Sequence, residues 1–499
     1  MPTSTSTTIG FSSKACHNCR RRRLRCDRSH PSCHKCSLAG ETCLGYGTLL
    51  RWANAPAIRG NLAGKSPVPL RGSGVTTSNP ATPTLHHPSL AIVPALVDPM
   101  FNRLSRASRL YVHHFGEAVV RDLVSIDQGS HNPFRIMIPL IEQFDYLEAI
   151  VVATGALHLA TLHKYQGRPV SNELVDALAA KGNAIKLLRI AVDNCTPANQ
   201  TTIIAAILFF VNLDLIDSGR GVWKNHIDAA GSLIASLQRQ KSQLAPSLVP
   251  LADAITHDCL TYRIFGSMVN GPEAAAAPIY DDIDVLAMLE AGQAFSYHCC
   301  PPVILRIILA ASKLGEEVDS SLTDKATIYS RVEELVQEAR SFDVESWVYS
   351  IEGLSPHDDL DTRIKLAEAH RSAACLYVIL VAFDPEDGVL PQSQLDELVT
   401  ETFYHLSFVP IDHVHLKATI LPTFMAGAQT NDEFWRTWCL ERLQAVWTKN
   451  PFICPWGYIR TAMGMLQDIW AARDHDAKTG AKVNWLRRLK NSQETFLIV

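Results

Sequence analysis

Residues 16–43 read CHNCRRRRLRCDRSHPSCHKCSLAGETC. In each half of this stretch, two residues separate the first two cysteines and six residues precede the third. Cysteines separated by two residues are typical of structural zinc sites, because both thiolates reach one metal ion. The expected metal ligands are the cysteines of both halves, Cys16, Cys19, Cys26, Cys33, Cys36 and Cys43.

The number of cysteines indicates how many zinc ions they hold. Two tetrahedral zinc ions need eight ligand bonds, which six thiolates supply only if two of them bridge both metals. Because Cys16 and Cys33 are the equivalent first cysteines of the two halves, the repeat predicts that they are the bridging ligands. One alternative is a single zinc ion on the first two cysteines of each half, which leaves Cys26 and Cys43 without a role. A disulfide network is a third interpretation. We favour two zinc ions.

Arginines occupy nearly every position between the second and third cysteines, from Arg20 to Arg25. A short helix after the first cysteine pair would present several of them on one side. Arginine reads the O6/N7 edge of guanine in the major groove, and other basic side chains contact phosphates. We therefore expect this segment to bind double-stranded DNA. The alternatives are a nuclear-import signal and a merely solvated basic patch.

Composition excludes several protein classes. The chain has 499 residues and is 47% hydrophobic, which excludes a wholly disordered protein. Residues 1–75 carry a net charge of +10 and residues 76–499 carry −14. The thirteen cysteines are sparse and odd in number, and no signal peptide opens the chain, so a secreted disulfide scaffold is not expected. The most apolar stretch, Ile203–Ile216, is shorter than the roughly 20 residues that span a membrane. We expect a soluble intracellular protein.

The chain divides into four predicted segments: a disordered N-terminus (1–13), the metal-binding domain (14–46), a linker (47–97) and a large domain (98–499). Residues 53–99 contain eight prolines, which forbid a continuous helix there. No heptad run follows the cysteines, so a dimer would have to form through the large domain.

Apolar residues of the large domain recur at three- and four-residue steps, which predicts helices. Strand-like alternation is rare. The sequence therefore predicts a mostly α protein whose large domain is all-α, with a possible division near residues 275–300. The expected helical stripes span residues 101–123, 147–162, 174–192, 329–339, 366–380, 434–447 and 459–470.

The cysteine segment resembles the fungal zinc binuclear cluster, with which all six cysteine positions match. The resemblance implies a sequence-specific DNA-binding domain that holds two Zn²⁺ ions and reads CGG-type triplets. In that family the third and fourth residues after the second cysteine approach the bases, and here these are Arg22 and Arg23. Lysine is common at the fourth position. The resemblance assigns phosphate contacts to Arg20, Arg25 and Lys35.

The remainder of the chain resembles the second type of fungal-specific transcription factor domain, seen in the acriflavine-sensitivity control family. This resemblance implies an all-helical regulatory region. The stretches that carry it include Ser108-Arg109-Leu-Tyr111, Asn132-Pro133-Phe134-Arg135, Leu421-Pro422-Thr423-Phe424, Pro455-Trp456-Gly457-Tyr458 and Phe496-Leu-Ile-Val499.

No enzyme is expected, because the sequence has no HExxH, GxSxG, Walker or GxGxxG motif. Trp223, the Cys299-Cys300 pair and the C-terminal tryptophans are interpreted as core residues. The sequence predicts a nuclear regulator of RNA polymerase II transcription that activates a pathway-specific gene set. The expected partners are DNA, the transcription machinery and a second copy that pairs through the helical domain. A repressor and a zinc-stabilised protein-interaction module are the alternatives. No membrane partner is expected, and the sequence identifies no effector.

Overall fold

The computed structural model describes two compact units, residues 1–91 and 92–499, and each is considered by itself. The predicted segments 1–13 and 47–97 lie outside the described residues. The structure describes residues 14–29, 32–40, 43–46, 101–170, 172–271, 284–320, 324–383, 392–448, 454–480, 483–492 and 494–499.

The first unit contains two five-residue helices, α1 (His17–Arg21) and α2 (His34–Leu38). Each helix begins directly after a cysteine, whose sulfur accepts a hydrogen bond from the amide of the third residue along. Among the described residues, the buried cluster of this unit consists of cysteines alone, and Leu24 and Leu38 are exposed. Since five-residue helices are not stable in isolation, the sulfur cluster has to hold this unit together.

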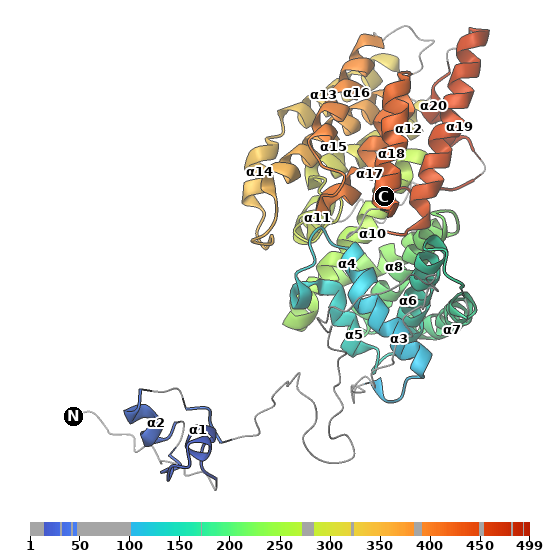
Figure 1. The fold of residues 1–499 in the computed structure, drawn as a ribbon. Helices are drawn as coiled ribbons and strands as arrows, with labels where there is room; N and C mark the ends of the chain where they lie inside the picture. The colour runs from blue at the N-terminus through green and yellow to red at the C-terminus, as the bar shows by residue number, and fades with distance from the viewer. Residues whose placement is uncertain are drawn as a thin grey trace, which may run out of the picture. The chain divides into compact units, whose positions relative to one another are not determined.

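The second unit is helical throughout its described residues, where only two isolated β-bridges occur, which confirms the predicted fold class (Figure 1). Six of the seven predicted stripes fall within single α-helices, and the stripe 101–123 covers two α-helices and the π-helical turn between them but is not helical at residues 102–105. The α-helices are α3 (Arg106–His114), α4 (Val120–Asp122), α5 (Met137–Leu140), α6 (Asp145–Tyr165), α7 (Glu173–Asp193), α8 (Gln200–Asp217), α9 (Trp223–Arg239), α10 (Val249–Val269), α11 (Val285–Gly292), α12 (Pro302–Ser320), α13 (Lys325–Ser341), α14 (Val344–Ser350), α15 (Leu360–Ala382), α16 (Gln392–Ser407), α17 (Ile420–Gln429), α18 (Glu433–Thr448), α19 (Gly457–Thr479) and α20 (Trp485–Lys490). Short 3-10 or π-helical turns lie at Phe115–Val119, Gly129–His131, Pro133–Ile136, Lys241–Gln243, Pro246–Leu248 and Val414–Thr419.

Helix α10 lies between the group α3–α9 and the group α11–α20 (Figure 1). It is buried along nearly its whole length and packs against α8, α9, α11 and α12. A single hydrophobic cluster runs from Leu104 to Val499, so the two groups of helices share one core on either side of residues 275–300. Trp223 and the Cys299-Cys300 pair are buried in this unit, as expected.

Helices α6 and α8 are long and apolar enough to cross a membrane by length and composition. The sequence analysis expected a segment of insufficient length at Ile203–Ile216, whereas α8 extends over 18 residues. Both helices are mostly buried, α8 almost completely, so their apolar side chains face protein neighbours. This burial is typical of core helices.

A buried ion cluster joins α15 to the turn before α17. The Asp358 carboxylate accepts hydrogen bonds from Arg363 at 2.6 Å and from His415 Nε2 at 2.7 Å, and all three side chains are fully or almost fully buried. Burial alone would lower the pKa of His415, but the neighbouring Cys299 thiol and Asp358 carboxylate raise that pKa to about 9.

This raised pKa predicts a pH-dependent stability. The folded protein binds the His415 proton more tightly than the unfolded chain, whose histidine pKa is near 6.5. The stabilisation is complete below about pH 6.5 and is lost as the pH rises through 9. We expect the free energy of unfolding of the full chain, measured by urea titration, to fall across this window. His415→Gln should flatten the slope.

His405→Gln is the control for this measurement. Burial lowers the pKa of His405 to about 4, so its titration lies outside the window. Equal slopes for the wild-type chain and His415→Gln would show that the His415 proton does not stabilise the fold.

Candidate metal centre and nucleic-acid interface

The six predicted cysteine ligands come together in the first unit. Two overlapping groups of four have their sulfur atoms within 4.8 Å of one another. Both groups contain Cys16 and Cys33, whose sulfurs lie 3.5 Å apart. The first group adds Cys19 and Cys26, and the second adds Cys36 and Cys43.

These sulfur spacings fit zinc. A tetrahedral zinc ion with Zn–S bonds of about 2.3 Å places its sulfur ligands about 3.8 Å apart. The Cys16–Cys36 and Cys19–Cys33 sulfur distances are 3.8 and 3.7 Å. Two tetrahedra that share the Cys16–Cys33 edge therefore match the six sulfurs. The single-zinc alternative gives no reason for Cys26 and Cys43 to lie in these groups.

Asp27 connects the two cysteine repeats. It follows the third cysteine, and its carboxylate accepts hydrogen bonds from the Ser29 hydroxyl at 2.6 Å and the His34 amide at 2.9 Å. These bonds hold the pKa of Asp27 well below its usual range. Since His34 opens α2, the carboxylate fixes the start of the second repeat relative to the end of the first.

Tyr46 also contacts the cysteine unit. Its hydroxyl donates to the Ser29 carbonyl at 2.6 Å, and its ring packs on the cysteine cluster. No role for Asp27 or Tyr46 was predicted from the sequence. Asp27 precedes His34 by seven residues and the N-cap of α2 is Cys33, so no capping signal in the sequence links Asp27 to this helix.

The arginine run turns sharply where α1 ends. The Leu24 amide donates to the Cys19 carbonyl at 2.9 Å, and the Arg23 amide donates to the Arg20 carbonyl at 3.3 Å. This pair of bonds is a Schellman motif, which requires a left-handed residue at the position of Arg23. Arg23 has φ 57° there, whereas glycine is the usual residue.

The predicted DNA contacts are all exposed. Arg20 is in the last turn of α1 and Arg22 is its C-cap residue. Arg23 and Arg25 follow, so four exposed guanidinium groups lie within six consecutive residues. Lys35 is exposed on α2. The assignment of these five residues as DNA contacts stays a prediction.

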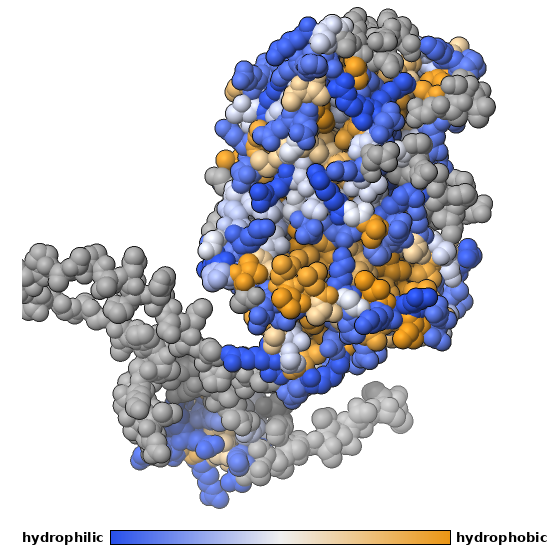
Figure 2. Space-filling view, turned by 90° about the vertical axis from the view of Figure 1, so that its right-hand side faces the viewer, coloured by the Kyte–Doolittle hydropathy of each residue, from blue (hydrophilic) through white to orange (hydrophobic). Residues whose placement is uncertain are grey.

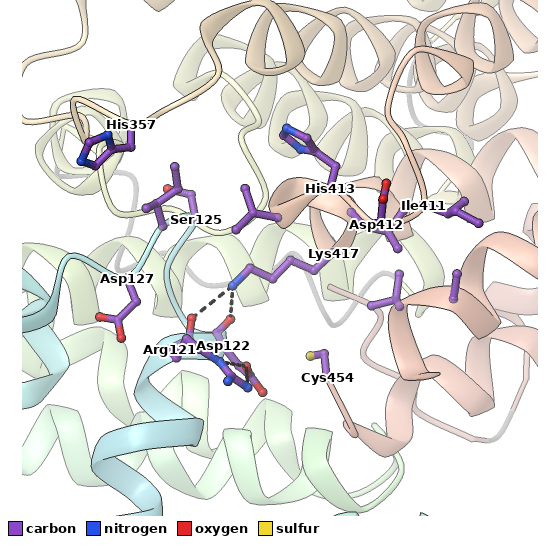
Figure 3. Close-up of a pocket in the computed structure, with 15 residues that line it drawn as sticks. Arg121, Asp122, Ser125, Asp127, His357, Ile411, Asp412, His413, Lys417 and Cys454 are labelled. Atoms are coloured by element: carbon purple, nitrogen blue, oxygen red, sulfur yellow. Dashed lines mark hydrogen bonds and ion pairs between the residues drawn. The ribbon is translucent and has the colours of Figure 1, made fainter. Parts of the chain in front are cut away.

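The second unit contains a cavity of about 440 Å³, lined in part by residues 121–127 and 411–417 (Figure 3). Lys417 is directed toward residues 121–124, and its ammonium donates to the carbonyls of Arg121, Asp122 and Val124. Burial lowers the pKa of Lys417. Because three carbonyls take its three N–H groups, this ammonium holds two chain segments together. The cavity is therefore lined by polar groups that already stabilise the fold.

Comparisons with known proteins agree with this geometry. Residues 14–53 match the fungal Zn(2)-Cys(6) binuclear cluster domain, and residues 109–498 match the fungal specific transcription factor domain. The chain is 43% identical to the acriflavine sensitivity control protein acr-2 of Neurospora crassa over 97% of each chain. It is 22% identical to the phomenoic acid biosynthesis cluster-specific transcriptional regulator of Leptosphaeria maculans, over 75% of this chain and 70% of that one. No solved structure matches.

The shared Cys16–Cys33 edge predicts how zinc content responds to substitution. Cys16→Ser removes a ligand from both groups of four, whereas Cys26→Ser removes one from the first group only. We expect native mass spectrometry of the full chain to show two zinc ions for wild type, about one for Cys26→Ser and close to none for Cys16→Ser.

Cys195→Ser is the matched control, because this cysteine is free and lies outside the cluster. It should keep both zinc ions. Equal zinc loss from Cys16→Ser and Cys26→Ser would contradict the bridging role of Cys16.

Proposed function

Because this chain belongs to the fungal transcription factors that join a Zn(2)-Cys(6) binuclear cluster to a fungal specific transcription factor domain, we propose that it reads CGG-like triplets in the DNA major groove. The protein is a zinc-binding transcription regulator and not an enzyme. Its family membership implies a nuclear location.

The proposed metal ligands are the six cysteines, with Cys16 and Cys33 bridging the two ions. Six thiolates close two tetrahedra and leave no open coordination position, so the zinc acts structurally. When bound, zinc supplies the stable centre that this unit lacks among its described apolar side chains. We propose residues 14–46 as the DNA-binding domain and residues 98–499 as the regulatory domain.

The conformation of Arg23 carries the proposal of base reading. A non-glycine residue in a left-handed conformation costs about 1 kcal/mol, and the turn at Arg23 brings its exposed side chain next to that of Arg22. At this position a glycine would complete the Schellman motif without strain. The retention of an arginine, exposed and next to Arg22, fits recognition of guanine O6 and N7. Arg20, Arg25 and Lys35 are then available to neutralise phosphates.

We also propose that the protein activates a pathway-specific set of genes, through the transcription machinery, as a homodimer formed by its helical domain. The Leptosphaeria relative is described as a biosynthesis cluster-specific regulator, which supports the pathway-specific part. The absence of a heptad run after the cysteines supports pairing through the large domain.

Selection from a random DNA pool with the full-length protein tests the proposal. We expect enrichment of a CGG-like triplet, with paired triplets if the protein binds as a dimer. If a protein loaded with two zinc ions enriches no sequence, the basic head is an import signal on a zinc-stabilised interaction module.

Arg23→Gly separates the fold from DNA recognition. The variant relieves the left-handed arginine, so the zinc-bound unit should become about 1 kcal/mol more stable. Loss of the guanine contact should weaken binding to the selected site by about 1–3 kcal/mol. Thermal unfolding and fluorescence anisotropy measure the two effects.

Arg28→Gly is the matched control for Arg23→Gly, because Arg28 is also left-handed, with φ 65°, and is not a proposed contact. It should gain stability without loss of specificity. If the two variants bind DNA equally well, Arg23 does not read a base.

Salt dependence tests the phosphate contacts. The three proposed phosphate contacts, Arg20, Arg25 and Lys35, predict that the logarithm of the affinity falls against the logarithm of the salt concentration with a slope of about −3 for each bound DNA-binding domain. Lys35→Gln should reduce this slope by about 1 and leave the sequence preference unchanged. A slope near zero in anisotropy titrations would exclude groove binding.

A further inference from the structure

Helix α7 exposes an apolar face. Only three of its side chains are buried, namely Ala177, Ala184 and Leu188. The helices packed against α7 are α6 and α8. Figure 2 shows hydrophobic side chains gathered on the lower half of the side where α7 lies. Six large apolar side chains of this one helix are between 42% and 66% exposed: Leu174, Val175, Leu178, Ile185, Ile190 and Val192.

The exposed face has the spacing of a helix pair. Steps of three and four residues lead along it from Val175 to Val192, which is the a/d pattern of two packed helices. A single helix that packs on its own fold needs only one such face, and α7 already uses Ala177, Ala184 and Leu188 on its inner side. The residues of the outer pattern are Val175, Leu178, Gly182, Ile185, Arg189 and Val192.

Gly182 forms a notch in the middle of this face. A Cβ atom built at Gly182 meets nothing within 4 Å, so its own fold does not require glycine there. Gly155 on α6 is different, since a Cβ there would lie 2.2 Å from the Tyr111 carbonyl oxygen. Glycine within a helix weakens it. The space beside Gly182 is not filled by the protein's own side chains, so a side chain of another molecule can occupy it.

The charge on the face selects one orientation. Parallel pairing of two α7 helices would oppose Arg189 to Arg189 of the second copy, which repels. Antiparallel pairing instead places Val175 against Val192, and Leu178 against the aliphatic stem of Arg189. The same register places Ile185 of each copy in the Gly182 notch of the other. The face is therefore complementary to itself about a two-fold axis.

We propose that α7 pairs antiparallel with α7 of a second copy and that this contact forms the homodimer, an inference that rests on the dimeric part of the proposed function. A 21-residue helix is about 31 Å long and about 10 Å wide, so its footprint is about 310 Å² on each copy. Stable interfaces bury about 800 Å² per partner. The dimer is thus of moderate affinity, and DNA with paired triplets strengthens it through effective concentration.

Sedimentation velocity of the full-length, zinc-loaded protein without DNA tests the contact. We expect a concentration-dependent dimer in the micromolar range. Leu178→Asp and Ile185→Asp should each raise the dimer dissociation constant by about 30-fold or more, because each buries a charge at the centre of the interface. Both side chains are exposed in one copy, so thermal unfolding should be nearly unchanged.

Tyr349→Asp is the matched control, since Tyr349 is 61% exposed on α14. It should leave the dimer intact. Gly182→Leu should fill the notch and weaken the dimer while the single copy folds normally. Combining Gly182→Leu with Ile185→Ala exchanges the protruding and the small residue and should restore dimerisation.

The outcomes separate this inference from the function on which it rests. A dimer that survives both aspartate variants places the interface elsewhere and overturns the α7 contact. A monomer at all concentrations, with single triplets selected from the DNA pool, overturns the homodimer as well. If the wild-type protein is a monomer in solution but still selects paired triplets, Leu178→Asp decides: loss of the preference for paired triplets supports the α7 contact on DNA, and an unchanged preference overturns it.

Discussion

The 3.5 Å approach of the Cys16 and Cys33 sulfurs is the contact on which the DNA-binding unit depends. Each of these cysteines also caps a short helix, so the metal-binding atoms and the helix starts are fixed by the same two residues. The described part of this unit has no hydrocarbon core to replace them. Metal binding and folding are therefore one process here, and the arginines are presented only when zinc is bound.

The large unit is stabilised in a different way. Its main core is a large hydrocarbon cluster that includes α10, and several of its buried charges are paired with one another. Lys417 and the Asp358 cluster connect segments that are distant in sequence, which explains why charged groups are retained so deep in the fold.

The two units divide the work of a regulator. Residues 14–46 form the zinc-cluster domain that the family uses to bind DNA, and the helical unit is the fungal specific transcription factor domain, through which we propose that two copies pair. The linker predicted between them contains no heptad run. If two copies pair through α7 as proposed, two DNA-binding domains act on one DNA molecule at a high effective concentration.

Cysteine spacing by itself favoured two zinc ions, because only six thiolates with two of them bridging fill two tetrahedra, and the resemblance of these cysteines and arginines to a known domain indicated the class of the protein. Apolar periodicity likewise determined that the large domain is helical. Periodicity did not determine which face of α7 is buried, since apolar residues occur on both sides and only the position of α6 decides between them. The left-handed turn at Arg23 and the link from Asp27 to α2 were likewise decided by the tertiary structure, because both depend on backbone hydrogen bonds that the metal core imposes.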